Sequence, residues 1–274
     1  MKSCSKMSDV DWGSLNPNRH VAAMVFAVHD ISDRDIAGWT MLMVDLANKH
    51  FWTKPSSRKG HHHPVDEFCK GGLVLHTLRV AELAVQIREM RQDEPSKTSD
   101  MLFSAALIHD MCRYGKPGDL GSEFRSNHDI LIYEQAKLIP VKVKESKIIL
   151  FAASAHMGRW ASFSRSPYFG LRADALAKDV HMADCIASGR ENIITPRLVK
   201  KAMEISDKEA DSFGSFLCAH QTLLMFSLIQ DIFKGLTLLA SRHANAANPE
   251  QKAVPKQDST FKRIQRVLAR ICRR

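Results

Sequence analysis

The sequence has little of what sheet proteins need. Aromatic residues make up only 7% of the 274 residues, and segments in which Val, Ile or Thr alternate with polar residues are scarce. Strands are rich in such residues, so their scarcity favours helices. The 45% hydrophobic and 25% charged residues exclude collagen-like, coiled-coil and wholly disordered chains. The length suffices for one large domain or two small ones.

The sequence also lacks several cysteine and targeting motifs. No two of its six cysteines form a Cys-x-x-Cys pair, which excludes zinc ribbons and thioredoxin-type motifs. The N-terminus has no apolar core of signal-peptide length, so we expect free thiols and a cytoplasmic location. The longest uncharged run, residues 212–230, contains His220 and two glutamines, which favours a buried core helix and no membrane span.

Hydrophobic residues recur at helical spacing along most of the chain. Helices are expected within 18–48 with Ser32 or Asp33 as a cap, at 100–112 with Ser99 as a cap, and at 73–90, 128–138, 143–156, 173–188, 195–206 and 213–242. We therefore expect an all-α protein without internal repeats. Its predicted parts are an N-terminal helical extension (1–50), a central helical domain (51–243), and a linker with a basic amphipathic helix (244–274).

Positive charge is concentrated at the C-terminus. The formal net charge is +9, and residues 252–274 hold eight Lys or Arg against one acid, Asp258, which leaves +2 for the rest of the chain. Such a tail favours an anionic partner such as nucleic acid, although a solvated helix end would carry the same charges.

Histidine and aspartate occur in a pattern that indicates a buried polar site. The dipeptide His-Asp occurs three times, so the pair alone has little meaning. His109-Asp110, however, ends the apolar run 101–108, where an unpaired buried charge would be costly. Three further residues of this kind lie in apolar parts of other predicted helices: His76, His156 and Asp184. Imidazoles and carboxylates that converge from several helices are what a divalent transition-metal site requires.

This ordered set resembles the HD-domain superfamily of metal-dependent phosphohydrolases. The segment Phe-Trp-Thr-Lys-Pro-Ser-Ser (51–57), the three histidines 61–63, and Gly-Gly-Leu-Val-Leu-His-Thr-Leu-Arg-Val-Ala (71–81) look like the start of that domain. They are closest to the branches in 3′-to-5′ exoribonucleases, phage HD proteins and conjugative relaxases. Residues 105–113 are similar to the central His-Asp motif, and residues 183–186 to the closing Asp motif. The resemblance covers residues 51–190 and implies an HD-domain helical bundle with added N-terminal helices and a basic C-terminal helix.

The resemblance implies two divalent transition metals (Mn, Fe, Ni, Co or Zn) and these ligands: His76, His109, Asp110, His128, His156 and Asp184. Asp110 would bridge the two metals, and His128 and His156 would complete the second site. Arg113 lies where many members have a lysine, and a guanidinium there can neutralise a phosphate, with Lys116 as the alternative. The Gly-Tyr-Pro and His-His-Glu motifs of the cyclic-di-GMP phosphodiesterase branch are absent.

We expect a phosphohydrolase that cleaves phosphoester bonds of nucleotides or nucleic-acid ends through a metal-activated hydroxide. The expected catalytic residues are Asp110, Arg113 and His63, although His62 is an equal candidate for the acid by position. The expected substrate-binding residues are Lys54, Arg58, His62, Lys116 and Arg159. The substrate would be a phosphorylated small molecule or a single-stranded nucleic acid.

Two other functions fit the same residues. A minority of HD-like proteins use this six-ligand set with mixed-valent iron as oxygenases, and an imidazole and carboxylate site suits either metal chemistry. Alternatively, the chain is a nucleic-acid-binding or processing module in which the HD site is accessory. The basic loop residues favour the hydrolase.

Deletion of residues 252–274 tests the predicted role of the basic tail. If the tail binds nucleic acid, the full-length protein should bind a labelled single-stranded oligonucleotide with an affinity that falls steeply as salt rises. The deletion should lower both the affinity and the salt dependence, as measured by fluorescence anisotropy at several salt concentrations. Identical binding curves for the two proteins would contradict this role.

Overall fold

The computed structural model of the chain describes residues 12–57, 63–90, 97–119, 121, 123–139, 141, 143–160, 171–190 and 194–217. The chain divides into two units, Met1–Met225 and Phe226–Arg274, and all described residues belong to the first. The predicted linker and basic helix (244–274) and most of the predicted helix 213–242 lie outside the described residues. The predicted domain boundaries therefore stay predictions.

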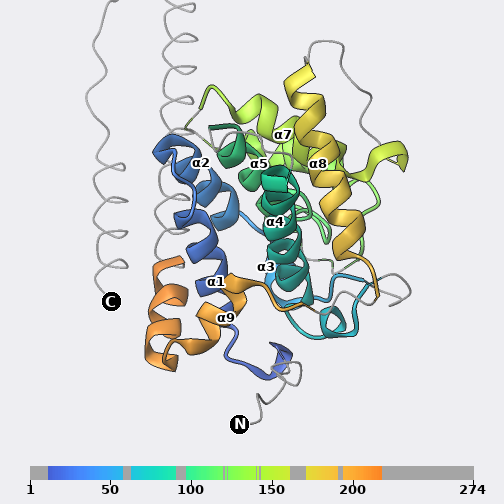
Figure 1. Ribbon diagram of the computed structural model, residues 1–274. Coiled ribbons are helices and arrows are strands. Elements are labelled where there is room, and N and C mark those ends of the chain that lie inside the picture. The colour runs from blue at the N-terminus through green and yellow to red at the C-terminus, as the bar shows by residue number, and fades with distance from the viewer. Residues whose placement is uncertain are drawn as a thin grey trace, which may run out of the picture. The chain divides into compact units, whose positions relative to one another are not determined.

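The described residues are helical and contain no strand, which confirms the all-α prediction (Figure 1). The 3₁₀ helices are η2 (Trp12–Ser14), η3 (Val65–Phe68) and η4 (Ala155–Trp160). The α-helices are α1 (Asn18–His29), α2 (Arg34–Asp45), α3 (Lys49–Thr53), α4 (Gly72–Met90), α5 (Lys97–Ile108), α6 (His128–Ala136), α7 (Ser146–Ser154), α8 (Leu171–Ala187) and α9 (Arg197–Glu204). Residues 207–217 are also helical.

A local cap explains where α2 begins, and ion pairs with distant residues explain where α5 begins. Asp33 caps α2, because its side chain accepts hydrogen bonds from two backbone N–H groups of the first turn. The predicted cap Ser99 is wrong, because α5 begins two residues earlier, at Lys97. The Lys97 ammonium forms ion pairs with Asp33 and Glu145, 2.9 and 3.0 Å away, which anchor this earlier turn.

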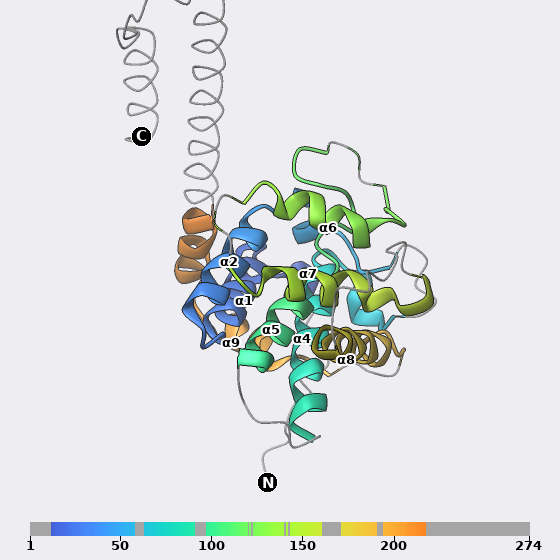
Figure 2. The same cartoon turned by 90° about the horizontal axis from the view of Figure 1, so that it is seen from above.

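Helix α4 lies at the centre of the bundle. It packs against α5 and α8, and also contacts α1, α3 and α9. In Figure 2, α1, α2 and α9 lie on one side of α4 and α5, and α8 lies on the other. Helix α7 contacts both α5 and α8, and α6 packs on α7. Helices α5 and α8 therefore pack directly on α4, and α7 packs on both of them.

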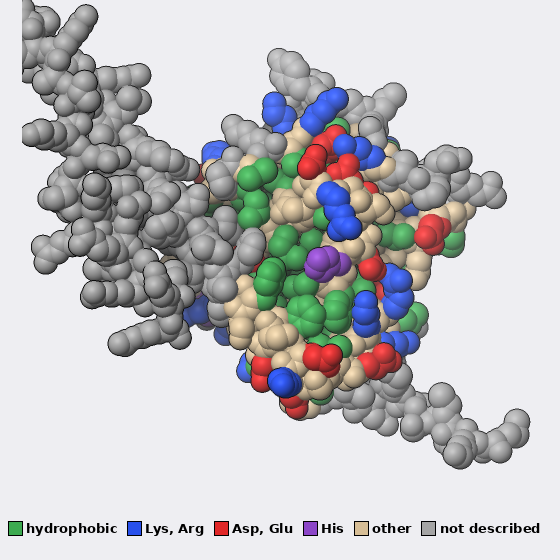
Figure 3. Space-filling view, turned by 90° about the vertical axis from the view of Figure 1, so that its left-hand side faces the viewer, with side chains coloured by type: hydrophobic (Ala, Val, Ile, Leu, Met, Phe, Trp, Pro, Cys, Tyr) green, Lys and Arg blue, Asp and Glu red, His purple; other side chains and the backbone are tan. Residues whose placement is uncertain are grey.

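One continuous apolar core joins the helices before residue 50 to the rest of the bundle. Met24, Ile36 and Met43 belong to the same buried cluster as Leu78 of α4 and Leu107 of α5. Figure 3 shows further hydrophobic side chains gathered on the side of the molecule where α1, α2 and α9 lie, with acidic and basic side chains at the edges.

Two other expectations can be compared with the described part of the chain. Its cysteines, Cys69, Cys112 and Cys185, are free thiols, as predicted. None of its helices combines the length and the apolar character that crossing a membrane requires.

Two consecutive glycines at the start of α4 allow other residues to approach it closely. Gly71 has a φ of 79°, in the left-handed region that favours glycine, and a Cβ there would lie 2.0 Å from Cε1 of His20. A Cβ on Gly72 would lie 2.0 Å from the carbonyl oxygen of Glu67. Gly72 thus allows η3 to lie directly against the first turn of α4, and Gly71 allows the same close approach of His20 from α1.

Replacement of Gly72 by alanine should therefore destabilise the protein. The added methyl group would push η3 away from α4, at a cost of about 1–3 kcal/mol. The control is Gly38→Ala in α2, where nothing lies within 4 Å of the new methyl group. That variant should gain about 0.5–1 kcal/mol, because alanine favours helix. Denaturant unfolding measures both, and equal stability of the two variants would contradict the close approach at Gly72.

Candidate metal centre

The six predicted metal ligands lie together around α4. His76 belongs to α4, and His109 and Asp110 follow the last residue of α5. The remaining ligands are His128 at the start of α6, His156 in η4 and Asp184 in α8. Five of the six are buried, and the Asp184 side chain is 23% exposed. His76 and His128 lie in the first two turns of their helices, Asp184 lies in the last turn of α8, and the other three follow the ends of α5 and α7, which explains how residues far apart in sequence meet.

Three of the imidazoles are oriented by the same kind of hydrogen bond. The Nδ1 atom lies close to the carbonyl oxygen three residues earlier, at 2.7 Å for His109, 2.9 Å for His128 and 2.6 Å for His156. A carbonyl oxygen only accepts hydrogen bonds, so in each ring Nδ1 must carry the hydrogen. In the neutral ring, Nε2 then keeps a lone pair, and all three Nε2 atoms point into the cluster.

Asp110 lies between two pairs of imidazoles. Its Oδ2 is 4.0 Å from Nε2 of His76 and 3.8 Å from Nε2 of His109. Its Oδ1 is 2.9 Å from Nε2 of His128 and 3.5 Å from Nε2 of His156. The two oxygens of one carboxylate thus face different pairs, which is the arrangement of a ligand that bridges two cations.

Asp184 closes the cluster on the side of α8. Its Oδ1 lies 3.1 Å from Nε2 of His76. The donor atoms form three overlapping groups, and within each group all atoms lie within 4.8 Å of one another: His76 with His109 and Asp110, His109 with His156 and Asp184, and Asp110 with His128 and His156. The structure thus brings all six residues together, and their role as metal ligands stays a prediction.

The donor set fits divalent transition metals, which favour imidazole nitrogen and carboxylate oxygen. The buried Nε2 of His109 has no hydrogen-bond partner among the described residues. The Nε2 atoms of His128 and His156 lie 3.3 Å apart, so two lone pairs face each other when both rings are neutral. Buried lone pairs without partners are costly, and a bound cation would satisfy them.

The charge states of His109, Asp110 and Asp184 also suit a cation. Burial lowers the pKa of His109 to about 4, so this ring is neutral at pH 7. Burial opposes the charge of Asp110, but Arg113 and the nearby imidazoles hold the pKa of its carboxyl well below the usual value. Burial likewise opposes the charge of Asp184, but His76 keeps the pKa of that carboxyl low. Neutral imidazole and ionised carboxylate are the forms that bind metals. Burial opposes the charge of His76, but Glu67 and Asp184 raise the pKa of this ring to about 10, so a metal must displace a proton from His76.

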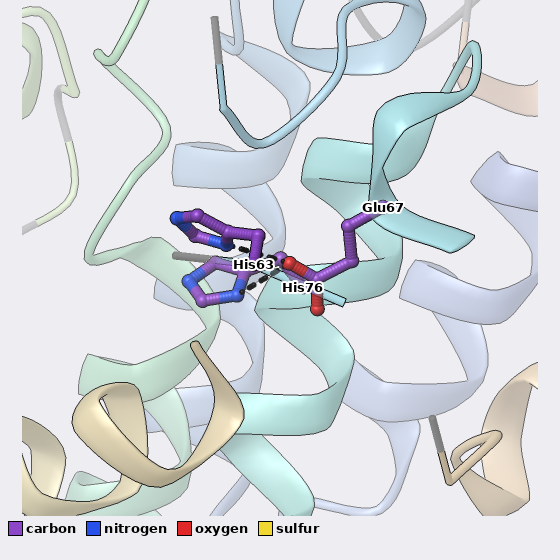
Figure 4. Close-up of side chains that lie close together, drawn as sticks. All are labelled: His63, Glu67 and His76. Atoms are coloured by element: carbon purple, nitrogen blue, oxygen red, sulfur yellow. Dashed lines mark hydrogen bonds and ion pairs between the residues drawn. The ribbon is translucent and has the colours of Figure 1, made fainter. Parts of the chain in front are cut away.

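Sequence analysis missed one carboxylate, Glu67 of η3, which is fully buried beside His76. Its Oε2 lies 2.7 Å from Nδ1 of His63 and 3.2 Å from Nδ1 of His76 (Figure 4). The contact to His76 has the distance of an ion pair but not the direction of an ideal hydrogen bond. The sequence feature that could have revealed a buried acid is Arg79, three residues after His76. A guanidinium in an apolar helix needs such an acid as its partner.

The predicted catalytic cation and acid lie next to the six ligands. Nη1 of Arg113 is 3.1 Å from Oδ1 of Asp110, and its guanidinium lies 4.5 Å from the centre of the Phe124 ring. His63 is 8% exposed, and its ring centre lies 4.9 Å from that of His76. The structure thus brings Arg113 and His63 to the cluster, and their roles stay predictions.

The predicted substrate-binding residues are only partly described. The carbonyl oxygen of Lys54 accepts a hydrogen bond from the backbone of Leu73 in the first turn of α4. The carbonyl oxygen of Lys116 accepts one from the side chain of Asn48, 2.7 Å away. The other predicted substrate contacts lie outside the described residues: Arg58, His62 and the side chain of Arg159.

Replacement of Asp110 by alanine should remove most of the bound metal, because both pairs of imidazoles lose the shared carboxylate. Metal content is measured by plasma mass spectrometry after loading with Mn²⁺ and gel filtration. The control is Asp179→Asn, since Asp179 is another buried acid, 3.2 Å from Arg88. Wild-type protein and the control should retain two metals per chain. Equal metal content in Asp110→Ala would contradict the bridging role.

Comparison with known proteins agrees with this geometry. The family model of the HD domain matches residues 73–189, a range that contains all six predicted ligands. Searches of curated proteins and of solved structures gave no match to the chain. The matched range begins in the first turn of α4 and ends two residues after α8, so it covers the helices that surround the cluster. Residues 73–189 are therefore an HD domain, a family whose members are generally hydrolases.

Proposed function

We propose that the protein is a dinuclear phosphohydrolase that cleaves phosphoester bonds of nucleotides or nucleic-acid ends. The observation that carries this proposal is the position of Asp110, whose two carboxylate oxygens face different pairs of imidazoles. A site with one shared carboxylate and separate imidazoles on each side suits two cations that act on one phosphate.

The ligands divide into two sets that share Asp110. His76, His109 and Asp184 would hold one metal, and His128 and His156 would hold the other. Bound divalent metals lower the pKa of coordinated water towards neutrality and offset the negative charge of a phosphoryl group. The hydrogen bonds at Nδ1 keep the imidazoles in place, so no reorientation of these rings is needed during the reaction.

The position of Arg113 is evidence for an anionic substrate. Its guanidinium lies beside Asp110 and over Phe124, and its buried Nε has no hydrogen-bond partner in the described part of the chain. A guanidinium held in this way can donate to phosphate oxygens. A phosphate substrate uses this cation, and for this reason we rank the phosphohydrolase above an iron oxygenase with the same ligands.

His63 is the proposed acid for the leaving group. Its Nδ1 lies 2.7 Å from the Glu67 carboxylate and 3.1 Å from Oγ of Ser56. Because Nδ1 is engaged, Nε2 is the nitrogen that gives a proton to the leaving oxygen when both ring nitrogens of His63 are protonated. His63 also packs against the ring of His76, which brings it close to the proposed metal site.

A hydrolysis screen tests the proposed reaction. Wild-type protein loaded with Mn²⁺ should release product from at least one class among nucleoside mono- and triphosphates, dinucleotides, cyclic nucleotides and short single-stranded RNA or DNA. Asp110→Ala should be slower by three orders of magnitude or more, because several kcal/mol of charge stabilisation depends on the metals (about 1.4 kcal/mol per tenfold). Its circular dichroism should match that of wild type.

Two controls make the screen decisive. Asp179→Asn should cleave at the wild-type rate, because Asp179 pairs with Arg88 outside the cluster. Chelation should stop cleavage, and added Mn²⁺ should restore it. Wild-type protein that carries two metals but cleaves none of these substrates would contradict the proposal. Oxygen consumption by such protein, loaded with iron and supplied with organic substrates, would support the oxygenase.

A further inference from the structure

We infer that Glu67 is a positioning residue that orients the metal ligand His76 and the acid His63 through one carboxylate oxygen. This inference rests on the proposed function. It gives the buried glutamate a role in metal binding and in proton transfer, in addition to its ion pair with Arg79.

His76 differs from the other imidazoles of the cluster in what holds its Nδ1. His109, His128 and His156 each donate to a neutral backbone carbonyl. His76 instead has a carboxylate oxygen 3.2 Å from Nδ1. A carboxylate at this position selects the tautomer whose Nε2 is free to bind metal, and it makes that nitrogen a stronger donor. Loss of the Glu67 charge should therefore weaken the metal site that contains His76.

The same oxygen also holds His63. Oε2 of Glu67 lies 2.7 Å from Nδ1 of His63, and the two rings meet at 69° with their centres 4.9 Å apart. Figure 4 shows both rings on the same side of the Glu67 carboxylate. With both Nδ1 atoms at the carboxylate, the Nε2 atoms point away from it, and Nε2 of His76 is 3.1 Å from Asp184. One group thus orients a ligand and a proton donor at once.

Glu67 is itself held from several directions. Its other oxygen, Oε1, accepts a hydrogen bond from the guanidinium of Arg79. The Arg79 guanidinium also contacts Asp66, at 2.7 Å, and Ile194, whose carbonyl oxygen is 3.1 Å from Nε. Ser56 donates its hydroxyl hydrogen to Oε2, 2.9 Å away. Because Arg79 lies one turn after His76 on α4, the carboxylate is fixed relative to the helix that carries the metal ligand.

A purely structural role predicts a different result. If Glu67 only neutralised Arg79, its loss would lower stability and leave the metal affinity of the folded protein unchanged. Removal of both charges would then restore the stability, because no buried charge would remain unpaired. A positioning role predicts that metal affinity stays low even when stability returns.

The experiment therefore measures metal affinity and thermal stability in parallel. Mn²⁺ affinity is determined by competition with a chelating dye, and the midpoint of thermal unfolding is determined on the same metal-free samples. Glu67→Gln keeps the size of the side chain and removes its charge, so the Mn²⁺ affinity should fall about 10–100-fold. The double variant Glu67→Gln/Arg79→Met should regain most of the lost thermal stability without regaining the affinity.

Two further variants separate the parts of the inference. Asp179→Asn removes another buried acid paired with an α4 arginine, and its Mn²⁺ affinity should equal that of wild type. His63→Ala should bind Mn²⁺ as wild type does but turn over more slowly, whereas Glu67→Gln should lose both affinity and turnover. Wild-type affinity in Glu67→Gln, or affinity that returns with stability in the double variant, would overturn the inference. Wild-type protein that binds metal without cleaving phosphoesters would refute the proposed function alone, because the affinity comparison needs no substrate.

Discussion

The hydrogen bond at Nδ1 of three of the four clustered imidazoles is the interaction on which the site depends. The two nitrogens of the ring point in different directions, so a fixed Nδ1 also fixes where the lone pair of Nε2 points. For His109, His128 and His156 the acceptor is a backbone carbonyl one turn earlier, so the position of a helix end sets the direction of each ring. The bundle must therefore bring these helix ends together, and Asp110 lies where they meet.

This arrangement concentrates groups that do not stabilise the fold by themselves. Buried lone pairs and carboxylates cost free energy unless they find partners, and the cluster supplies only some of them. Two arginines provide part of the compensation, since Arg79 pairs with Glu67 and Arg113 pairs with Asp110. The rest of the compensation is expected from bound cations, which couples metal binding to stability.

The helices and five of the six clustered residues were predictable because each signal is local, whereas His128 was predicted only through the resemblance to the HD-domain superfamily. Apolar periodicity identifies helices such as α4, and a histidine or aspartate within an apolar run is conspicuous in the sequence. Glu67 was not predictable in the same way. It lies in a short 3₁₀ helix without periodicity, and its burial depends on how closely η3 approaches α4, which is a tertiary contact. The start of α5 was misplaced for a similar reason, because Lys97 is anchored by acids distant in sequence.

The two glycines at the start of α4 affect the geometry of the site through the backbone. Gly72 has no side chain, so the carbonyl of Glu67 can lie against the first turn of the helix. That contact carries the Glu67 carboxylate to His76, one turn further along α4, and to His63 in the preceding loop. The left-handed conformation of Gly71 makes the required turn. Neither glycine provides a side chain to the site, yet the close approach at Gly72 places the carboxylate that contacts His76 and His63, so the Gly-Gly pair and the histidine that follows form one structural unit.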